Sequence, residues 1–208
     1  MSRVIIRRRG LSFLQDLMKK FVSVVVICLV AACSQPDAPK PDNPIVPSMP
    51  KGIVRTDGHR AVNVSVAGDA QCRALSASET GIALSQTNAV RAQAGLSSLR
   101  GNAKLQKAAQ QQACDMARRG QMDHRGVAST GPGMRVKQLG YTPRITAENI
   151  AAGASSIFDL NGALREWSSS AKHRENIVIP QLQDMGIGHA LSADGRFAYW
   201  SVVYSAPR

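Results

Sequence analysis

A carboxylate inside an apolar run is the feature that most constrains how this chain can fold. Residues 145–153 read ITAENIAAG, and Glu148 stands in the middle of them. An ionised carboxylate taken out of water is destabilising unless a partner pairs with it or donates hydrogen bonds to it. The sequence therefore allows two arrangements. Either Glu148 faces solvent at a turn, or it points into a polar pocket that uses its charge.

The N-terminus has the composition of a targeting segment. Arginines at residues 7–9 and the pair Lys19-Lys20 precede an apolar run over residues 21–32, which ends at Cys33. A run of this length is short for a membrane span but typical of an export signal. We therefore interpret residues 1–32 as a signal peptide, and Met18 is an alternative start because a complete signal follows it.

The residues that end the apolar run, Val30-Ala31-Ala32-Cys33, resemble a bacterial lipobox. This resemblance implies cleavage before Cys33 and acylation of that cysteine, which would hold the protein on a membrane. Two alternatives stay open, namely an ordinary signal peptide with an A-x-A-like site and a short anchor left uncut. The lipobox predicts a location in the bacterial cell envelope, facing the periplasm or the exterior.

The charge of the chain argues against nucleic acid as a partner. The full chain carries a net charge of +12, which falls to +7 once residues 1–32 are removed. The remaining basic residues are scattered, and aromatic residues make up only 4% of the chain, so no basic stripe with stacking platforms is evident. A mildly positive surface facing anionic lipids or wall polymers is the simpler interpretation.

Composition divides the exported part into a spacer and a globular region. Residues 33–50 are rich in proline, which favours an extended spacer, and residues from 51 onward have a globular composition. Two cysteines remain there, Cys72 and Cys114. In an exported protein an even pair predicts a disulfide, although two separately buried thiols would also fit.

The globular region alternates helical and strand-like patterns. Valines alternate within residues 53–67, which predicts a short strand. Helices are expected over residues 78–94, from Asn102 as N-cap to Gly120, over 133–139 and over 159–169. The C-terminus reads as a β-hairpin with an Asp-Gly turn between residues 185–191 and 197–205. Mixed α and β layers follow.

Several motifs occur in the order found in the CAP superfamily, which comprises cysteine-rich secretory proteins, antigen 5 and pathogenesis-related proteins. Residues 82–208 resemble its bacterial branch, with residues 51–81 as an N-terminal extension. The matching segments include Asp123-His124, the stretch AENIA at residues 147–151, WSSSAKHREN at 167–176, MGIG at 185–188 and YWSVV at 199–203. The resemblance implies an α+β fold of the three-layer α-β-α sandwich type.

The resemblance also implies a site. In the family the equivalents of His124 and Glu148 project into one open cleft, so Glu148 is expected to pair with His124. Animal and plant members add a second Glu and a second His, where this chain has Ser170 and Ala198. His173 either compensates in the cleft or is a helix-end histidine bonded to carbonyls.

Two classes of function are compatible with this site. The first is a binding module for a lipid, a glycan or wall polymer, or an envelope protein, and we favour it over catalysis. The second is a hydrolase with His124 as base and Glu148 as its orienting group or as a metal ligand. No cofactor is required by the first, whereas His124 and Glu148 could hold a divalent cation such as Zn²⁺ in the second. His59 and His189 are expected at the surface, although His189 alternates with Ile187 in a strand and could face either side.

Overall fold

The computed structural model describes residues 52–208. The predicted signal peptide, the lipobox with Cys33 and the proline-rich spacer lie outside this range. Among the described residues, no helix is long and apolar enough to cross a membrane.

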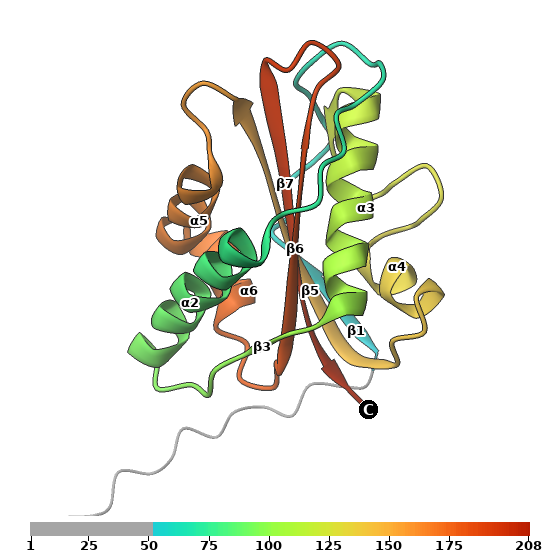
Figure 1. The fold of residues 1–208 in the computed structure, drawn as a ribbon. Coiled ribbons are helices and arrows are strands. Elements are labelled where there is room, and N and C mark those ends of the chain that lie inside the picture. Colours follow the sequence, from blue (N-terminus) through green and yellow to red (C-terminus); the bar gives the residue numbers. More distant parts are fainter. Residues whose placement is uncertain (1–51) are drawn as a thin grey trace, which may run out of the picture. The chain divides into compact units, whose positions relative to one another are not determined.

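A five-stranded sheet forms the central layer (Figure 1). Its order is β1-β5-β7-β6-β3. The long strands β5, β7 and β6 are antiparallel neighbours, whereas β1 and β3 pair in parallel with β5 and β6 at the two edges. A second, two-stranded sheet joins β2 and β4. The strands are Ile53–Thr56 (β1), Val62–Asn63 (β2), Arg100–Gly101 (β3), Gln121–Met122 (β4), Pro143–Ala154 (β5), Asp184–Leu191 (β6) and Phe197–Pro207 (β7).

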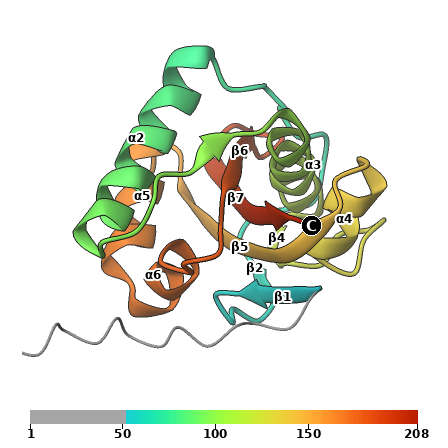
Figure 2. The same cartoon turned by 90° about the horizontal axis from the view of Figure 1, so that it is seen from below.

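Helices cover both faces of the central sheet, as the view along the sheet shows (Figure 2). One face carries α2, α5 and α6, and the other carries α3 and α4. The prediction of an α+β chain with a helix-flanked sheet is confirmed. The helices are Ala77–Gln93 (α2), Ala103–Arg119 (α3), Pro132–Gln138 (α4), Leu160–Ser169 (α5) and Ala171–Ile177 (α6).

Local capping sets the ends of the two long helices. Ser76 and Glu79 form a reciprocal capping box at the start of α2. The Asn102 side chain accepts hydrogen bonds from the first turn of α3, and Gly120 ends that helix in the left-handed conformation with φ +64°. The sequence predicted Asn102 and Gly120 as the ends of α3, and both are confirmed.

Helix α3 lies directly on strand β6 because two glycines leave room for its backbone. A Cβ atom added at Gly186 would overlap the backbone of Leu105 and Gln106, and one added at Gly188 would overlap the backbone of Ala109 and Gln110. Any side chain at these positions would push the helix off the sheet. The glycines of the MGIG motif therefore serve close helix–strand packing.

The predicted disulfide is confirmed. Cys72 and Cys114 are bonded, with their Cα atoms 5.3 Å apart. The bond ties the segment that precedes α2 to the middle of α3. Closing a loop of this length stabilises a fold by roughly 4 kcal/mol in the chain-entropy model.

One expectation about local structure was wrong. The alternating valines do not form one strand, since of them only Val62 joins a sheet, in β2, and Val66 is 87% exposed. The stretch around Glu148 lies in the 12-residue strand β5, whose middle is buried, so the solvent-facing turn that the sequence left open is not found. A strand buried on both faces shows no alternation of polar and apolar residues, which is why this pattern could not be recognised.

Candidate functional site

Glu148 is completely buried, and three side chains neutralise or solvate its carboxylate. Arg135 of α4 donates to Oε1 at 2.5 Å, and Ser201 of β7 donates to the same oxygen at 3.0 Å. His124 Nδ1 lies 2.9 Å from Oε2. Burial by itself raises the pKa of Glu148, but the charges of Arg135 and His124 outweigh burial and lower it. Of the two arrangements that the sequence allowed, the structure shows the paired, buried one.

His124 is held between two carboxylates. Its Nε2 lies 2.7 Å from Oδ1 of Asp57, opposite the contact with Glu148, and its side chain is only 9% exposed. Burial lowers the pKa of His124, yet the hydrogen bonds with Asp57 and Glu148 outweigh burial and raise it from 6.5 to about 9. His124 is therefore an imidazolium at neutral pH, and both of its ring nitrogens are donors.

This geometry limits the chemistry that His124 can perform. A general base needs a neutral ring with a free nitrogen close to the proton that it removes. A metal ligand also needs a free nitrogen lone pair. Both nitrogens of His124 are engaged, so the arrangement favours neither the hydrolase hypothesis nor a metal held by His124 and Glu148.

Asp57 was missed by the sequence analysis. It directly follows β1, whose last residue, Thr56, pairs with Glu148 across the sheet. Its Oδ2 accepts a hydrogen bond from the Ile150 backbone at 3.0 Å. Burial raises the pKa of Asp57, yet its hydrogen bonds, above all the one with His124, outweigh burial and hold that pKa far below the usual value. The only feature of the sequence that could have indicated Asp57 is an Asp-Gly-His triplet after a strand. The separation of 67 residues between Asp57 and His124 hides their contact from any local pattern.

The end of the WSSSAKHREN segment, HREN at residues 173–176, lies in α6 and supports the same site. Asn176 of α6 donates to the Glu148 carbonyl oxygen at 3.3 Å and to Oδ1 of Asn149 at 2.8 Å. Asn149 in turn donates to the carbonyl oxygen of His173 at 3.0 Å. These bonds join α6 to β5 next to Glu148, so Asn176 of one motif and Asn149 of the AENIA segment together fix the backbone beside the buried carboxylate.

His173 and Ser170, the other predicted cleft residues, lie in different surroundings. His173 is 2% exposed, and its Nε2 faces Oδ2 of Asp57 at 3.3 Å. Ser170 lies at the junction of α5 and α6, where its hydroxyl makes no capping hydrogen bond to α6. The structure thus brings His124, Glu148 and His173 together around Asp57 and leaves Ser170 outside the hydrogen bonds described for that group.

The two remaining histidines differ from each other. His59 is exposed, as expected, and its ring centroid lies 5.3 Å from that of His173. The expectation that His189 is a surface residue was wrong, since it is only 8% exposed and its ring lies 4.1 Å from the ring of Trp200. Burial, helped by the charge of Arg73, lowers the pKa of His189 to about 4.

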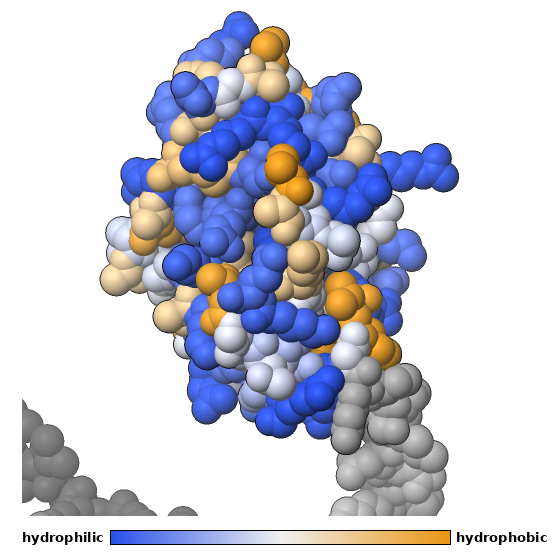
Figure 3. Space-filling model, turned by 90° about the vertical axis from the view of Figure 1, so that its right-hand side faces the viewer, coloured by the Kyte–Doolittle hydropathy of each residue, from blue (hydrophilic) through white to orange (hydrophobic). Residues whose placement is uncertain are grey.

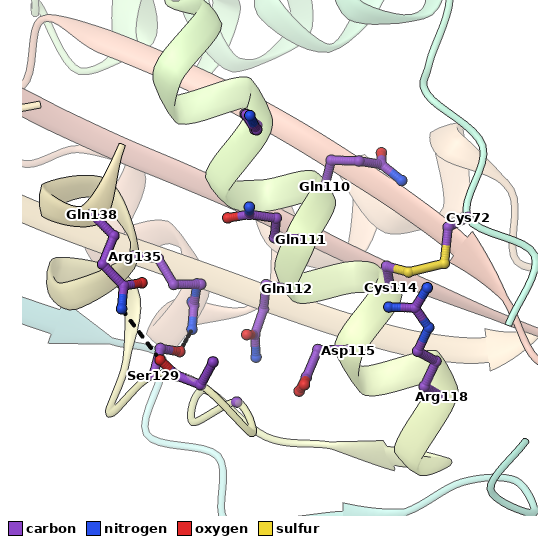
Figure 4. Close-up of a pocket in the computed structure, with 13 residues that line it drawn as sticks. Cys72, Gln110, Gln111, Gln112, Cys114, Asp115, Arg118, Ser129, Arg135 and Gln138 are labelled. Carbon is purple, nitrogen blue, oxygen red and sulfur yellow. Dashed lines mark hydrogen bonds between the residues drawn. A yellow bond between two sulfur atoms is a disulfide. The ribbon is translucent and has the colours of Figure 1, made fainter. Parts of the chain in front are cut away.

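A groove of about 470 Å³ runs along the outer side of α3, facing α4 and the loop between β4 and α4 (Figure 4). Figure 3 looks onto the α3 and α4 side of the molecule, where hydrophilic residues predominate. His124 and Glu148 do not line the groove. Arg135 connects it to them, because its guanidinium bonds Glu148, the His124 carbonyl oxygen and Ser129 of the groove wall. The groove is lined by Cys72, Lys107, Gln110, Gln111, Gln112, Cys114, Asp115, Arg118, Gly126, Ala128, Ser129, Arg135 and Gln138.

One group of described residues has the composition of a metal site. Single ligand atoms of Asp57, His59 and His173 all lie within 4.8 Å of one another. This set differs from His124 and Glu148, which the sequence suggested. It draws two of its three members from the N-terminal extension.

Comparisons with known proteins agree with the fold and the motifs. The family model of the cysteine-rich secretory protein family, CAP, matches residues 84–204. The uncharacterized protein YkwD of Bacillus subtilis is 30% identical over 106 residues, which span 51% of this chain but only 40% of YkwD. The matched part of YkwD is therefore less than half of that protein.

Solved structures show the same architecture. An outer surface protein from Borrelia burgdorferi superposes with a TM-score of 0.56 at 20% identity, over 64% of this chain and 95% of that protein. An extracellular protein with an SCP domain from Bacillus anthracis superposes with a TM-score of 0.54 at 22% identity, over 62% of this chain and 40% of its own. At these identities the likeness concerns the fold. Together with the family match over more than half of its length, it shows that this chain belongs to the CAP, or cysteine-rich secretory protein, family.

Proposed function

We propose that this protein is a binding module of the bacterial cell envelope, held on a membrane through lipidated Cys33, and that the groove beside α3 takes a wall glycan as its ligand. The groove beside α3 is the main support for this proposal. Its size, about 470 Å³, lies within the usual range of ligand sites. It is also backed by a buried polar network that fixes the position of its wall.

The lining of the groove suits a hydroxyl-rich polymer better than an acyl chain. Gln111 presents an exposed side-chain amide to the groove, whereas Gln110, Gln112 and Gln138 already donate to backbone carbonyl oxygens of the protein. Lys107 and Arg118 add positive charge, whereas the carboxylate of Asp115 is already paired with Arg119 at 2.8 Å. An anionic or neutral glycan could use Gln111, Lys107 and Arg118, whereas a bare hydrocarbon chain would offer these side chains no hydrogen bond.

The buried network preorganises the groove. Arg135 crosses from Glu148 to the carbonyl oxygen of His124 and the hydroxyl of Ser129, and Gln112 donates to the Asp123 carbonyl oxygen. The loop that forms one wall is thus tied to β5 by charged groups that water does not reach. A wall that is already ordered lowers the entropy cost of binding.

The envelope location rests on the sequence of the N-terminus and on the relatives. The Borrelia burgdorferi relative is described as an outer surface protein, and the Bacillus anthracis relative as extracellular. The apolar run that ends at Cys33, followed by a proline-rich spacer, adds the means of attachment.

Co-sedimentation with purified wall sacculi tests the groove. We expect the full-length protein, solubilised in detergent, to sediment with sacculi, and Gln111→Trp to lose most of this binding because the indole fills the groove. Ser85→Trp is the matched control, since it places the same exposed indole on α2 at the opposite face of the sheet. Equal binding by both variants, or none by the unmodified protein, would refute the groove as a glycan site.

Labelling with radioactive palmitate tests the anchor separately. The unmodified protein should take up label and fractionate with membranes, whereas Cys33→Ala should stay an unlabelled precursor. Equal labelling of both would rule out Cys33 as the acylated residue.

A further inference from the structure

We propose that Asp57, His59 and His173 form a binding site for a divalent transition-metal ion, with Zn²⁺ as the preferred ion. Their ligand atoms lie within 4.8 Å of one another at the place where the N-terminal extension crosses α6. The site goes beyond the proposed glycan groove, because none of its three residues lines that groove. Two imidazoles and one carboxylate are a donor set that zinc accepts.

The buried ring of His173, whose nitrogens make no hydrogen bond among the described residues, points to a ligand. The side chain of His173 is only 3% exposed. A buried polar atom without a partner is destabilising, and such atoms in native proteins call for a specific explanation. A metal ion bound to Nε2 would supply the missing partner.

The distance from His173 to Asp57 fits a shared metal better than a hydrogen bond. Nε2 lies 3.3 Å from Oδ2 of Asp57, which is longer than the hydrogen bonds of 2.7 and 3.0 Å that Asp57 makes with His124 and Ile150. Two ligands that each lie 2.0–2.2 Å from a tetrahedral Zn²⁺ are separated by about 3.4 Å. The two atoms are therefore already at the spacing that a common zinc ion requires.

The carboxylate of Asp57 is oriented for this role. Oδ1 accepts from His124 at 2.7 Å, and Oδ2 accepts from the Ile150 backbone at 3.0 Å, which leaves one lone pair of Oδ2 for a metal. On the other side of the imidazole, Oε1 of Glu166 lies 3.9 Å from Nδ1 of His173. Glu166 is half exposed and can move closer, and a carboxylate behind a ligating histidine is the usual outer-shell partner.

His59 completes the set from the surface. The Asp57 side chain accepts a hydrogen bond from the His59 backbone at 3.0 Å, and Gly58 turns the chain between them with φ +80°. The exposed His59 ring already lies 5.3 Å from the ring of His173, so a side-chain rotation brings its nitrogen to the metal. Because His59 faces solvent, a fourth position stays open to water or to a ligand atom.

Cobalt spectroscopy tests this site with a readout independent of any activity. The full-length protein, treated with chelator and dialysed, is titrated with Co²⁺, whose visible absorption is intense only in tetrahedral sites, and then with Zn²⁺ in competition. We expect one Co²⁺ per chain, displaced by one equivalent of Zn²⁺ and not by excess Mg²⁺, because imidazole ligands select transition metals.

Two variants separate this site from other metal-binding groups. His59→Ala should weaken Zn²⁺ binding at least about 10-fold, the lower end of what even an outer-shell change costs. Arg60→Ala, at the neighbouring exposed position, should bind as the unmodified protein does. All three proteins carry the same cysteines, so metal held by a thiol is unaffected by either change.

Two results would contradict the metal site. Unchanged Zn²⁺ affinity in His59→Ala, or no tetrahedral Co²⁺ spectrum in the unmodified protein, would overturn the proposal. Folding does not confuse the result, because His59 is exposed and circular dichroism reports the fold of each variant. Loss of sacculus binding by groove variants with intact Zn²⁺ binding would separate this proposal from the glycan groove.

Discussion

Two histidines of this protein are buried to the same extent and are perturbed in opposite directions. His124 is 7% exposed and His189 is 8% exposed. The pKa of His124 rises to about 9, because Asp57 and Glu148 accept hydrogen bonds from both of its nitrogens against the opposing effect of burial. The pKa of His189 falls to about 4, mainly through burial against Trp200 and helped by the charge of Arg73, which outweigh the opposing charge of Glu79.

Burial alone does not determine the charge of a histidine in this fold. Desolvation acts on both rings and favours the neutral form. At His124 two carboxylates reverse that preference, whereas the Nδ1 atom of His189 has no hydrogen-bond partner among the described residues. Charged partners therefore determine the protonation state of His124, whereas burial determines that of His189.

The largest expected effect is on stability. Glu148→Gln leaves the buried Arg135 without its opposite charge, and breaking a buried ion pair in this way costs about 3–5 kcal/mol. His189→Leu replaces a neutral ring by an apolar side chain and should cost less than about 1.5 kcal/mol. Urea denaturation at pH 7, with the disulfide intact, measures both. Similar losses in the two variants would show that the charges around Glu148 contribute no more to stability than the packing of His189.

The second effect is on the pH dependence of stability. His124, with a raised pKa, contributes stability that is complete below about pH 6.5 and is lost as the pH rises through about 9. His189, with a lowered pKa, contributes stability that is complete above about pH 6.5 and is lost as the pH falls toward about 4. Shifts of this size correspond to roughly 3 kcal/mol each.

Variants assign these two pH effects to their residues. Urea midpoints are measured from pH 4 to 10 in the presence of chelator. We expect the alkaline loss to become smaller in Glu148→Gln and the acid loss to become smaller in His189→Leu. The opposite assignment, or an unchanged curve in either variant, would contradict the pKa shifts.

A third experiment measures the pairing at His124 directly. Removing one carboxylate, in Glu148→Gln or in Asp57→Asn, should lower the pKa of His124 by about 1 unit or more, which corresponds to about 1.4 kcal/mol. His189 should not change, because neither carboxylate contacts it. Ring-proton NMR of the four histidines gives these values. A His124 shift below about 0.3 units in both variants would refute the pairing.

The smallest effect is expected at the exposed histidine. His59→Ala should change the free energy of unfolding by less than about 0.5 kcal/mol in the presence of chelator, as is usual for surface substitutions. Added Zn²⁺ should then stabilise the unmodified protein more than the variant, since only a folded site binds the ion. Equal stabilisation of both would place the metal elsewhere.

Much of the fold could be predicted because its determinants are local. Asn102 and Gly120 end α3 through capping interactions within one turn of the chain. The Asp-Gly turn sets the hairpin of β6 and β7 in the same way. The disulfide was predictable because only two cysteines follow Cys33. Each of these features depends on neighbours in sequence or on simple counting.

The site was predictable only in part. Glu148 could be recognised as a carboxylate in an apolar run, and the family motifs supplied His124 as its partner. Arg135 and Asp57 were not foreseen, although each bonds a member of the pair. An isolated arginine in a helix and an aspartate before a glycine look the same in sequence whether they face solvent or a buried ion.

Local sequence was thus enough to predict the helix ends, the hairpin, the disulfide partners and the need for a counter-charge at Glu148. Which groups supply that counter-charge follows from the three-dimensional packing. The parallel pairing of β1 with β5 carries Asp57 to His124 across 67 residues, and the packing of β6 turns His189 inward against Trp200. Local periodicity indicates which residues share a face, whereas the partner of a buried charge depends on elements that are remote in the chain and near in space.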